Sequence, residues 1–486
     1  MKWSGSEEPA IREPALSRGV TRHCTIARPA GAGAEGGDAV IGWLDRFFEI
    51  GARGSTLGRE VLAGATTWVT LAYIVLVNPI VLGAAGMDTG AVMVATCVGA
   101  ALATASAGVF ARLPVALAPG MGLNFFFAFT LCGTAATGGF GLSWQQALAA
   151  TFIAGVLFLA SSLFKLRSKL MDAVPEPLRH GIVAGIGLMI AVIGLRWAGL
   201  LVATPNIYIG PGDLGARPVQ VALVGLIVTA ILVIRRVPGA LLIGAGVSGA
   251  ASLGFGLTQF TGVVSAPPSI LPTFLALDFG GLFAAPTWIL AVVMLLIVDM
   301  FDTMGTLLGV TSRAGLMEDG QIPRAEAAFA SDAGGTMLGG LLGTSTITTY
   351  IESAAGIAAG GRTGLTALTT AGLLLCSMFF HPLLSVIGGV PIGEGITLYP
   401  VAAPILILIG IFMMPEVAKV PWDRPLAAIP AFFVVVGMPL TTSITNGIGA
   451  GFIAWSALHL LSGKGRDVSL VIHALAGLFV LLFLLE

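Results

Sequence analysis

The chain has 486 residues, of which 56% are hydrophobic and only 10% are charged. Soluble domains carry about 25% charged residues, so this composition excludes an ordinary soluble protein. The formal net charge of −1 gives no indication of a nucleic-acid partner. The apolar runs are each about 20 residues long rather than short and alternating, which indicates an all-α, polytopic protein of the lipid bilayer and not a barrel.

Residues 1–41 differ in composition from the rest of the chain. They are polar, rich in Pro, Gly, Ala and Arg, and lack the apolar core of about 7–15 residues that a signal peptide needs. This composition predicts a disordered N-terminal extension. An amphipathic run at 42–50 follows, and the first apolar segment begins near Arg59.

Fourteen or fifteen apolar segments follow, and two of them are interrupted. Pro119, Gly120 and Gly122 break the third segment, and a Gly/Ser/Thr-rich stretch replaces the apolar run at 343–361. The last three segments are short, so one of them could be a half-span or an interfacial helix. The expected segments are 59–83, 90–111, 113–132, 145–164, 178–200, 219–235, 239–260, 287–310, 326–342, 343–361, 364–381, 398–414, 425–440, 444–462 and 468–485.

Charge and spacing give the expected topology. With a cytoplasmic N-terminus, every Lys and Arg beyond the first 60 residues falls on the cytoplasmic side except Arg196 and Arg217, as the positive-inside rule requires. About sixty residues separate Arg59 from the first break, and nearly as many separate Thr287 from Thr344. Seven spans, an odd number, lie between the halves, so the second half is expected to be an inverted repeat. Broken segments at corresponding positions indicate a binding site near the midplane.

Three acidic residues within the apolar segments are the candidate site residues. Asp299 and Asp302 belong to the run IVDMFDTMG, and Glu352 lies inside the second break. A carboxylate at that depth costs at least ~2.5–3.5 kcal/mol on insertion scales, which makes each one a functional-site hypothesis. We predict that the three acids line one site for a small polar solute, where they accept N–H bonds or carry protons. Asn124 would add a donor and an acceptor.

The breaks themselves are expected to expose helix ends. A helix that begins halfway through the membrane has backbone N–H groups without intrahelical partners, and these can bind a polar ligand. The half-helix backbone expected at the site comes from Gly120, Gly122, Thr344 and Ser345. Each assignment has a structural alternative: Asn124 could join helices, Asp302 could bind a Thr or a backbone N–H, and the phenylalanines near 125 could face lipid or core.

Proton coupling is the natural hypothesis for such a site, because a carboxyl group in apolar surroundings can take up a proton and release it as the site changes sides. A sodium site has less support, since no further cluster of carboxylate and carbonyl ligands is evident. The cysteines and histidines are scattered and form no metal-ligand motif, so we expect no metal and no cofactor.

Four stretches resemble the hypoxanthine–guanine–adenine permeases of the nucleobase–cation symporter-2 superfamily. They are REVLAGATTWVTLAYIVLVNP (59–79), LAPGMGLNFFFAFTLC (117–132), DMFDTMGTLLGV (299–310) and GTSTITTYIESAAGIAAGGRTGLTA (343–367). The resemblance runs from about Trp43 to the C-terminus. It implies the uracil-permease fold, with fourteen spans in two inverted repeats of seven and short strands in the two broken helices. The implied domains after the extension (1–41) are core halves at 42–170 and 286–390 and gate halves at 171–285 and 391–486.

The resemblance also implies a function. It points to proton-coupled import of adenine, guanine and hypoxanthine across the plasma membrane by an elevator-like movement of core against gate, commonly in a homodimer. The purine-contacting residues of the family carry over to Asn124, Asp299, Asp302 and Glu352. Of these, Asp299 and Glu352 are expected to bind the base, whereas Asp302 is structural or proton-coupled. Phe125 replaces the usual Ala, where it could narrow the pocket or cover the face of a planar ring, and Ile347 replaces a Thr.

Alternative functions fit less well. An intramembrane aspartyl protease would need GxGD and Tyr-Asp motifs in its spans, and neither occurs there, so the chain is not expected to be an enzyme. An anion or bicarbonate carrier on the same fold would favour basic groups at the broken helices, where this chain has acids and Asn. A carrier of xanthine, urate or uracil is compatible with the fold but disfavoured by the TTYIES and GMGLN motifs.

Overall fold

The computed structural model describes residues 37–134, 139–163, 174–202, 209–313, 315–317, 322–392 and 396–485. The chain divides into two units, Met1–Trp43 and Leu44–Glu486. Most of the predicted N-terminal extension, residues 1–36, lies outside the described residues. The first described helix, α1 (Gly37–Phe48), ends just before Glu49, which has a positive φ of 59°.

Eight helices in the described part of the chain are long and apolar enough to cross a membrane. Four shorter apolar helices accompany them. Most of the expected apolar segments are therefore helical, whereas the count of fourteen spans and the inverted repeat stay predictions. The eight segments are Leu57–Gly83, Thr89–Ala111, Trp144–Ser162, Glu176–Trp197, Arg217–Ile234, Trp288–Ser312, Gly364–Ile387 and Ile444–Leu461.

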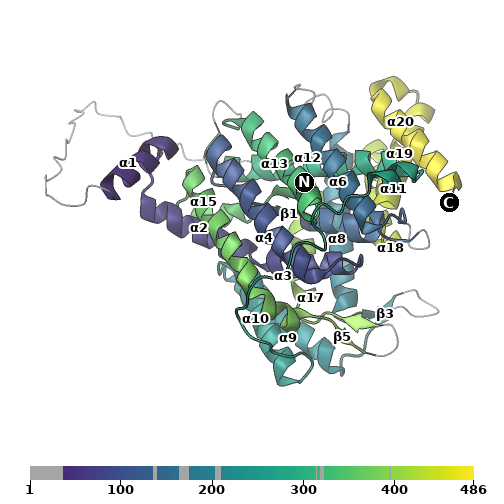
Figure 1. Cartoon of the computed structure of the whole chain (residues 1–486). Coiled ribbons are helices and arrows are strands. Elements are labelled where there is room, and N and C mark those ends of the chain that lie inside the picture. The colour runs from purple at the N-terminus through teal and green to yellow at the C-terminus, as the bar shows by residue number, and fades with distance from the viewer. Residues whose placement is uncertain are drawn as a thin grey trace, which may run out of the picture. The chain divides into compact units, whose positions relative to one another are not determined.

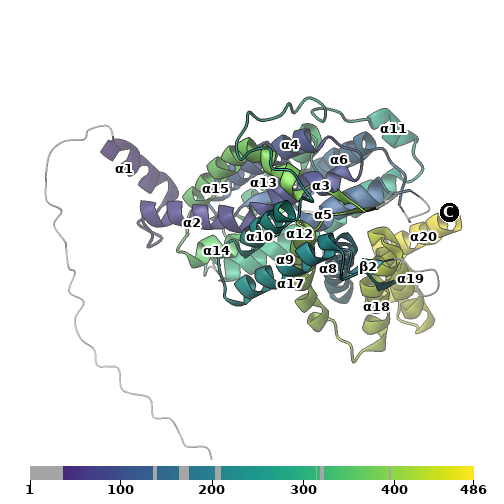
Figure 2. The ribbon, with the colours of Figure 1, turned by 90° about the horizontal axis from the view of Figure 1, so that it is seen from below.

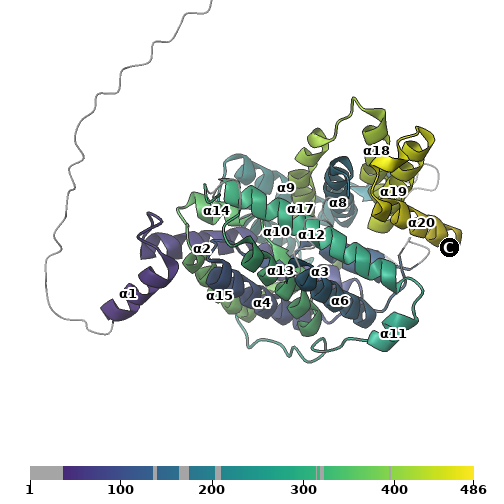
Figure 3. The ribbon, with the colours of Figure 1, turned by 90° about the horizontal axis from the view of Figure 1, so that it is seen from above.

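One group of helices packs around α13 and α15. Helix α13 packs against α6 and α4, and α15 packs against α2 and α4, so segments from both halves of the sequence lie side by side (Figure 1). Helix α12 runs along the side of this group that faces α8 and α17 (Figure 3). The members are α2 (Leu57–Leu71), α3 (Tyr73–Gly83), α4 (Thr89–Ser106), α6 (Trp144–Leu163), α12 (Trp288–Arg313), α13 (Ala325–Leu342) and α15 (Gly364–Ser377).

A second group of helices packs around α8 and α18. Helix α8 contacts α17 and α18, and α18, α19 and α20 follow one another at the C-terminal end (Figure 2). The members are α8 (Glu176–Trp197), α9 (Arg217–Ile234), α10 (Ala240–Gly254), α17 (Ala403–Met413), α18 (Pro425–Thr441), α19 (Ile444–Leu461) and α20 (Leu470–Leu485). These two groups contain the segments expected for core and gate, and the domain boundaries stay a prediction.

Two short strands lie at the two predicted breaks and pair with each other. Strand β1 (Leu117–Pro119) is antiparallel to β4 (Ile347–Thr349), with Ala118 opposite Thr348. A short helix follows each strand: α5 (Met121–Phe125), continued by the π-helix η2 (Phe126–Leu131), and α14 (Ser353–Ala358). Irregular backbone inside a membrane must find its hydrogen bonds within the protein. The two breaks meet because the backbone N–H and C=O groups of each strand form hydrogen bonds with those of the other.

A glycine of α13 makes room for this pairing. A Cβ on Gly339 would lie 2.2 Å from the carbonyl oxygen of Ser345, far inside van der Waals contact. The helix can therefore pass directly over the chain that enters β4 only because residue 339 has no side chain.

The remaining elements are short connections. Two small antiparallel hairpins occur, and helix α17 begins only at Ala403, five residues later than the expected segment, because Thr397 and Leu398 belong to a hairpin strand. The elements are β2 (Leu201–Val202), β3 (Gly210–Pro211), β5 (Val390–Pro391), β6 (Thr397–Leu398), α11 (Phe279–Ala284), α16 (Leu384–Ile387), the π-helix η1 (Ala107–Ala111) and the 3₁₀ turns η4 (Met378–Leu383), η5 (Met414–Lys419) and η6 (Gly465–Asp467).

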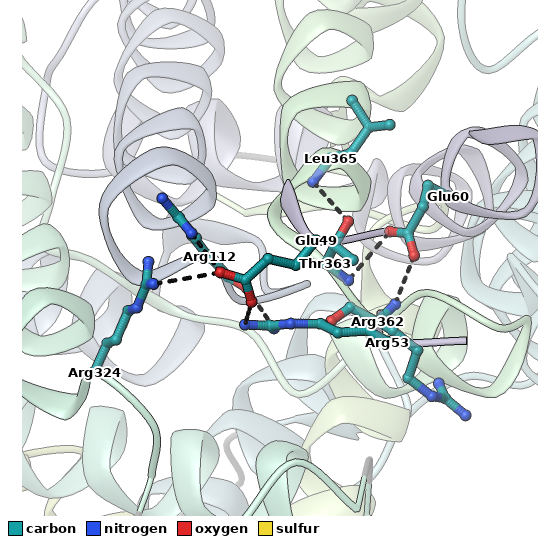
Figure 4. A network of polar contacts seen from close by, with 8 residues as sticks. All are labelled: Glu49, Arg53, Glu60, Arg112, Arg324, Arg362, Thr363 and Leu365. Atoms are coloured by element: carbon teal, nitrogen blue, oxygen red, sulfur yellow. Dashed lines mark hydrogen bonds and ion pairs between the residues drawn. The ribbon is translucent and has the colours of Figure 1, made fainter. Parts of the chain in front are cut away.

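A polar network joins the ends of several of these helices (Figure 4). Glu49 forms ion pairs with Arg112 at 2.6 Å, Arg53 at 3.5 Å and Arg324 at 3.8 Å. The buried carboxylate of Glu60 accepts from the backbone N–H groups of Arg362 (3.0 Å) and Thr363 (3.2 Å) at the start of α15. Glu60 thus caps α15 from another helix, on the side where the Lys and Arg distribution predicts the cytoplasm.

Candidate substrate-binding site

Four acidic side chains surround the paired strands. Asp299 and Asp302 come from α12, Asp332 from α13, and Glu352 immediately precedes α14. Asp299 and Asp332 are almost completely buried, at 1% and 0% exposure. Asp302 is close enough to Glu352 and to Asp332 for their charges to interact. The fold therefore brings the three predicted acids and a fourth into one region around β4.

Glu352 lines a cavity of the described structure. Its Oε1 accepts a hydrogen bond from the hydroxyl of Tyr73 at 2.7 Å. The cavity has a volume of about 280 Å³ and lies between the two helix groups. Its lining residues from the first group include Thr70 and Ala355, and those from the second include Val237, Leu241 and Phe412. A small polar solute that entered it would meet an acid on one side and apolar side chains on the other.

Asp302 lines a second, much smaller cavity of about 20 Å³, enough for about one water molecule. The cavity lies between Gly122 of α5 and Ile186 of α8. Gly120 lies beside it: a Cβ there would approach Thr348 Cγ2 to 2.6 Å and Asp302 Oδ2 to 3.6 Å. A side chain at position 120 would therefore collide with β4 next to the Asp302 carboxylate.

Asp299 lies on the side of α12 that faces α13. Its Oδ2 accepts from the hydroxyl of Thr336 at 2.8 Å, and its Oδ1 is buried without a partner. Thr336 also donates to the carbonyl of Ile347 at 3.3 Å, so Asp299 is linked to β4 through one side chain. Asp299 lines neither of the two cavities described above, and its expected contact with the solute stays a prediction.

Asp332 is the acid that sequence reasoning missed. Its Oδ1 accepts from the backbone N–H of Thr349 at 2.9 Å and from the Thr349 hydroxyl at 3.2 Å. Its Oδ2 accepts from Thr303 at 2.6 Å. A signal was present, because an acid in the middle of the apolar segment 326–342 carries the same insertion cost as Asp299 and Glu352.

Asn124 connects the two breaks. Its Oδ1 accepts a hydrogen bond from the hydroxyl of Ser345, and its Nδ2 lies 3.8 Å from the sulfur of Met121. Asn124 is fully buried, so in this structure it joins the segments before β4 and after β1, as the structural alternative proposed.

The expected positions of two half-helix residues need correction. Thr344 and Ser345 precede strand β4, and helix α14 begins only at Ser353, so their backbone N–H groups are not at a helix start. The Thr344 N–H donates to the carbonyl oxygen of Gly339 at 2.8 Å. The difference arises because the chain must first form the strand that pairs with β1. Gly120 and Gly122 do lie where expected, at the N-cap and in the first turn of α5.

Phe125 belongs to a row of aromatic rings rather than to either cavity. Its ring stacks on Phe129 with centroids 5.5 Å apart, and the ring of Trp197 lies 6.3 Å away. Trp197 in turn lies 4.4 Å from Tyr399. The row extends from α5 to the C-terminal end of α8. Its contact with a planar solute ring stays a prediction.

The comparison with known families decides the identity of the chain. The permease family model Xan_ur_permease matches residues 58–446, a region that includes both breaks and all four acids. The chain belongs to the permease family. The match confirms the resemblance to the purine permeases of the nucleobase–cation symporter-2 superfamily.

Individual relatives of this permease are similar over nearly their whole length. The adenine permease AdeQ of Escherichia coli (strain K12) is 39% identical over 448 residues, which cover 91% of this chain and 97% of AdeQ. The guanine/hypoxanthine permease PbuO of Bacillus subtilis (strain 168) is 39% identical over 451 residues, covering 90% of this chain and 99% of PbuO. The permease is therefore an integral membrane protein, and proteins of this family are transporters rather than enzymes.

Solved structures share the fold of this permease. The transmembrane domain of the cyanobacterial bicarbonate transporter BicA matches with a TM-score of 0.59 at 16% identity, covering 81% of this chain and 97% of that domain. SLC26A9 matches with a TM-score of 0.58 at 13% identity, covering 90% of this chain and 73% of that structure. At this level of identity the likeness concerns the fold alone, and the solute must be argued from the site.

Proposed function

We propose that this permease imports the purine nucleobases adenine, guanine and hypoxanthine. The observation that carries the proposal is the cavity of about 280 Å³ that Glu352 lines next to the paired strands. Its volume suits a small ligand, and it combines an acid with the apolar side chains of Leu241 and Phe412. A purine has the matching chemistry, because its edges carry N–H donors and its two faces are apolar. Relatives named adenine permease and guanine/hypoxanthine permease support the same class of solute.

The roles of individual residues follow from this proposal. Glu352 and Asp299 bind the base, with Asn124 as a further polar contact and Phe125 next to it. Of the half-helix residues expected at the site, Gly120 and Gly122 lie at the start of a helix, and their backbone takes the half-helix role. Asp302, between the small cavity and Glu352, takes a structural or proton-coupled role.

Proton symport is the coupling that we propose. Buried carboxylates around the paired strands can be neutralised by a proton on one side of the membrane and release it on the other. Asp302 and Glu352 are close enough for their charges to interact, so both are candidates to carry the proton. A proton would then enter and leave together with the base.

An elevator-like movement is the transport mechanism that we propose. The cavity has Glu352 and Thr70 on one wall, from the first helix group, and Val237 and Phe412 on the other, from the second. Displacement of the first group against the second would carry the acids and the base across the membrane. We further propose a plasma-membrane location, a cytoplasmic N-terminus in accordance with the Lys and Arg distribution, and a homodimer formed through the gate helices.

The test is uptake of radiolabelled hypoxanthine, adenine and guanine by cells that lack their own purine transporters. Expression of the permease should give saturable uptake, and unlabelled purines should compete with it. A Glu352→Gln variant present in the membrane at the same abundance serves as the matched control. Competition by xanthine, urate or uracil, with no competition by purines, would instead identify one of the alternative nucleobases.

A small anion is the second candidate, because the transmembrane domain of a bicarbonate transporter shares the fold. The acids around β4 argue against it, since an anion next to ionised carboxylates is repelled. Labelled bicarbonate uptake in the same cells, without purine uptake, would decide for the anion.

A further inference from the structure

Tyr73 lies at a change in the hydrogen-bond ladder of the first membrane-crossing segment. Helix α2 ends at Leu71, helix α3 begins at Tyr73, and the N–H of Val75 donates to the carbonyl of Ala72 at 3.2 Å in a tight turn between them. Pro79 further along α3 has no N–H for a helical hydrogen bond, which weakens the regular ladder beyond Tyr73. Ala72 between the two helices keeps right-handed helical dihedrals, so α2 and α3 form one membrane-crossing segment with a local change in its hydrogen bonds at Tyr73.

The hydroxyl of Tyr73 contacts Glu352 and also the hydroxyl of Tyr350. It donates to Glu352 Oε1 at 2.7 Å, while the tyrosine side chain as a whole is only 1% exposed. Thr70, on the same segment as Tyr73, lies with its hydroxyl 3.4 Å from the Glu352 carbonyl and lines the same cavity. The first segment therefore holds both the side chain and the backbone of Glu352.

A tyrosine hydroxyl has one hydrogen, so its bond to Oε1 fixes the orientation of the carboxyl group. The bond uses one lone pair of Oε1, so the second carboxyl oxygen keeps the larger acceptor capacity for a solute. That atom accepts from an N–H when Glu352 is ionised, and it can donate when Glu352 is protonated. An oriented carboxyl group presents its acceptor oxygen to the N–H groups of a base in one fixed direction, whereas a rotating carboxyl group would meet N–H groups at several positions of the base.

We propose that Tyr73 is a positioning residue for Glu352. Its hydroxyl holds the carboxyl group in the orientation that binds the solute, and so sets both the affinity and the ranking among nucleobases. This assignment rests on the proposed function, in which Glu352 binds a purine.

The first test replaces the hydroxyl and keeps the buried ring. Tyr73→Phe should raise KM for hypoxanthine about tenfold, the loss expected for one hydrogen bond to a charged group, with little change in the maximal rate. It should also reduce the differences in how strongly adenine, guanine and hypoxanthine compete with labelled uptake. The matched control is Trp68→Phe, which removes a hydrogen bond from α2 to Ser377 (2.8 Å) without contact to Glu352. Unchanged KM and unchanged ranking in Tyr73→Phe would overturn the positioning role.

The second test needs no transport. In a double-mutant cycle, the melting temperatures of purified wild type, Tyr73→Phe, Glu352→Gln and the double variant report whether the two side chains interact. We expect non-additive shifts for this pair and additive shifts when Trp68→Phe replaces Tyr73→Phe. Additivity for Tyr73 and Glu352 would overturn the contact and the proposal with it. A wild-type permease that takes up no purine would overturn the proposed function instead, and the cycle would still show whether Tyr73 holds Glu352.

Discussion

The backbone N–H of Thr349 donates to Asp332 Oδ1 at 2.9 Å, so that an acid of helix α13 holds the last residue of strand β4. The hydroxyl of the same threonine donates to the same oxygen at 3.2 Å. Only two residues, Tyr350 and Ile351, separate Thr349 from Glu352. The position of the candidate site acid therefore depends on a carboxylate that does not line either described cavity.

The first prediction concerns this support. Asp332→Ala should lower the melting temperature of the purified permease, because it leaves the buried Thr349 N–H without its acceptor, at a cost of about 1–3 kcal/mol, and removes one of the two partners of the Thr303 hydroxyl. Asp332→Asn keeps one acceptor oxygen and should cost less. Equal melting temperatures for wild type and Asp332→Ala would show that β4 is held in another way.

The sequence predicted the fold around this contact because the physical signals are local. Pro119 and the glycines near it interrupt an apolar run, and the polar stretch at 343–361 cannot be an ordinary span, so both breaks were expected where the strands lie. The long apolar helices follow from the same hydropathy argument. These features need no knowledge of what each segment packs against.

The details of the site depend on packing, which the sequence does not reveal. Thr344 and Ser345 were expected at a helix start, but the pairing of β4 with β1 moves the helix to Ser353. Asn124 binds Ser345 across 221 residues of sequence, a contact that no periodicity predicts. Tyr73 contacts Glu352 across a sequence separation that no periodicity predicts either.

The second prediction concerns the acids that we propose to bind the base. Glu352→Gln and Asp299→Asn should abolish purine uptake while the abundance of the protein in the membrane stays unchanged, because each replaces an acceptor carboxylate with an amide of the same size. Radiolabelled uptake with a surface-abundance assay measures both quantities. A wild-type rate in Asp299→Asn, together with loss of uptake in Asp302→Asn, would move the base-binding role to the residue that lines the small cavity.

The third prediction concerns coupling. If buried carboxylates carry a proton with each base, a protonophore should collapse uptake of hypoxanthine even with sodium present, and removal of sodium should leave the initial rate unchanged. The comparison uses the same cells with a potassium-for-sodium exchange. Uptake that persists in the protonophore and disappears without sodium would reverse the assignment of the coupling ion.

The fourth prediction concerns Phe125. Phe125→Ala removes a ring that packs between Phe129 and Trp197, next to Asn124, and should change the ranking among adenine, guanine and hypoxanthine more than it changes expression. Phe158→Ala is the matched control, because Phe158 is equally buried and packs against Phe329 instead. If the two variants gave the same competition profile as wild type, Phe125 would be a packing residue alone.

The fifth prediction concerns how the stability of the fold depends on pH. It involves Glu416 of η5, which lies outside the membrane-spanning helices and contacts the start of α8. Burial raises the pKa of Glu416, but hydrogen bonds from Lys419 (2.6 Å) and with His180 (2.7 Å) outweigh it, so the pKa is lowered overall. A carboxyl group with a lower pKa in the folded state stabilises the fold above its unfolded pKa, and this contribution is lost as the pH falls through the folded pKa.

Glu416→Gln should therefore melt at a lower temperature than wild type at pH 7, and the difference should shrink as the pH is lowered below the ordinary pKa of a glutamate. Thermal unfolding of the two purified proteins between pH 7 and pH 4 measures this trend. Glu176→Gln is the control, because that carboxylate also contacts His180, at 3.5 Å, but its side chain is 73% exposed. Solvent screens such a pair, so its replacement should change the melting temperature little at any pH. A difference for Glu416→Gln that stayed constant across this range would mean that the residue acts through packing and not through its charge.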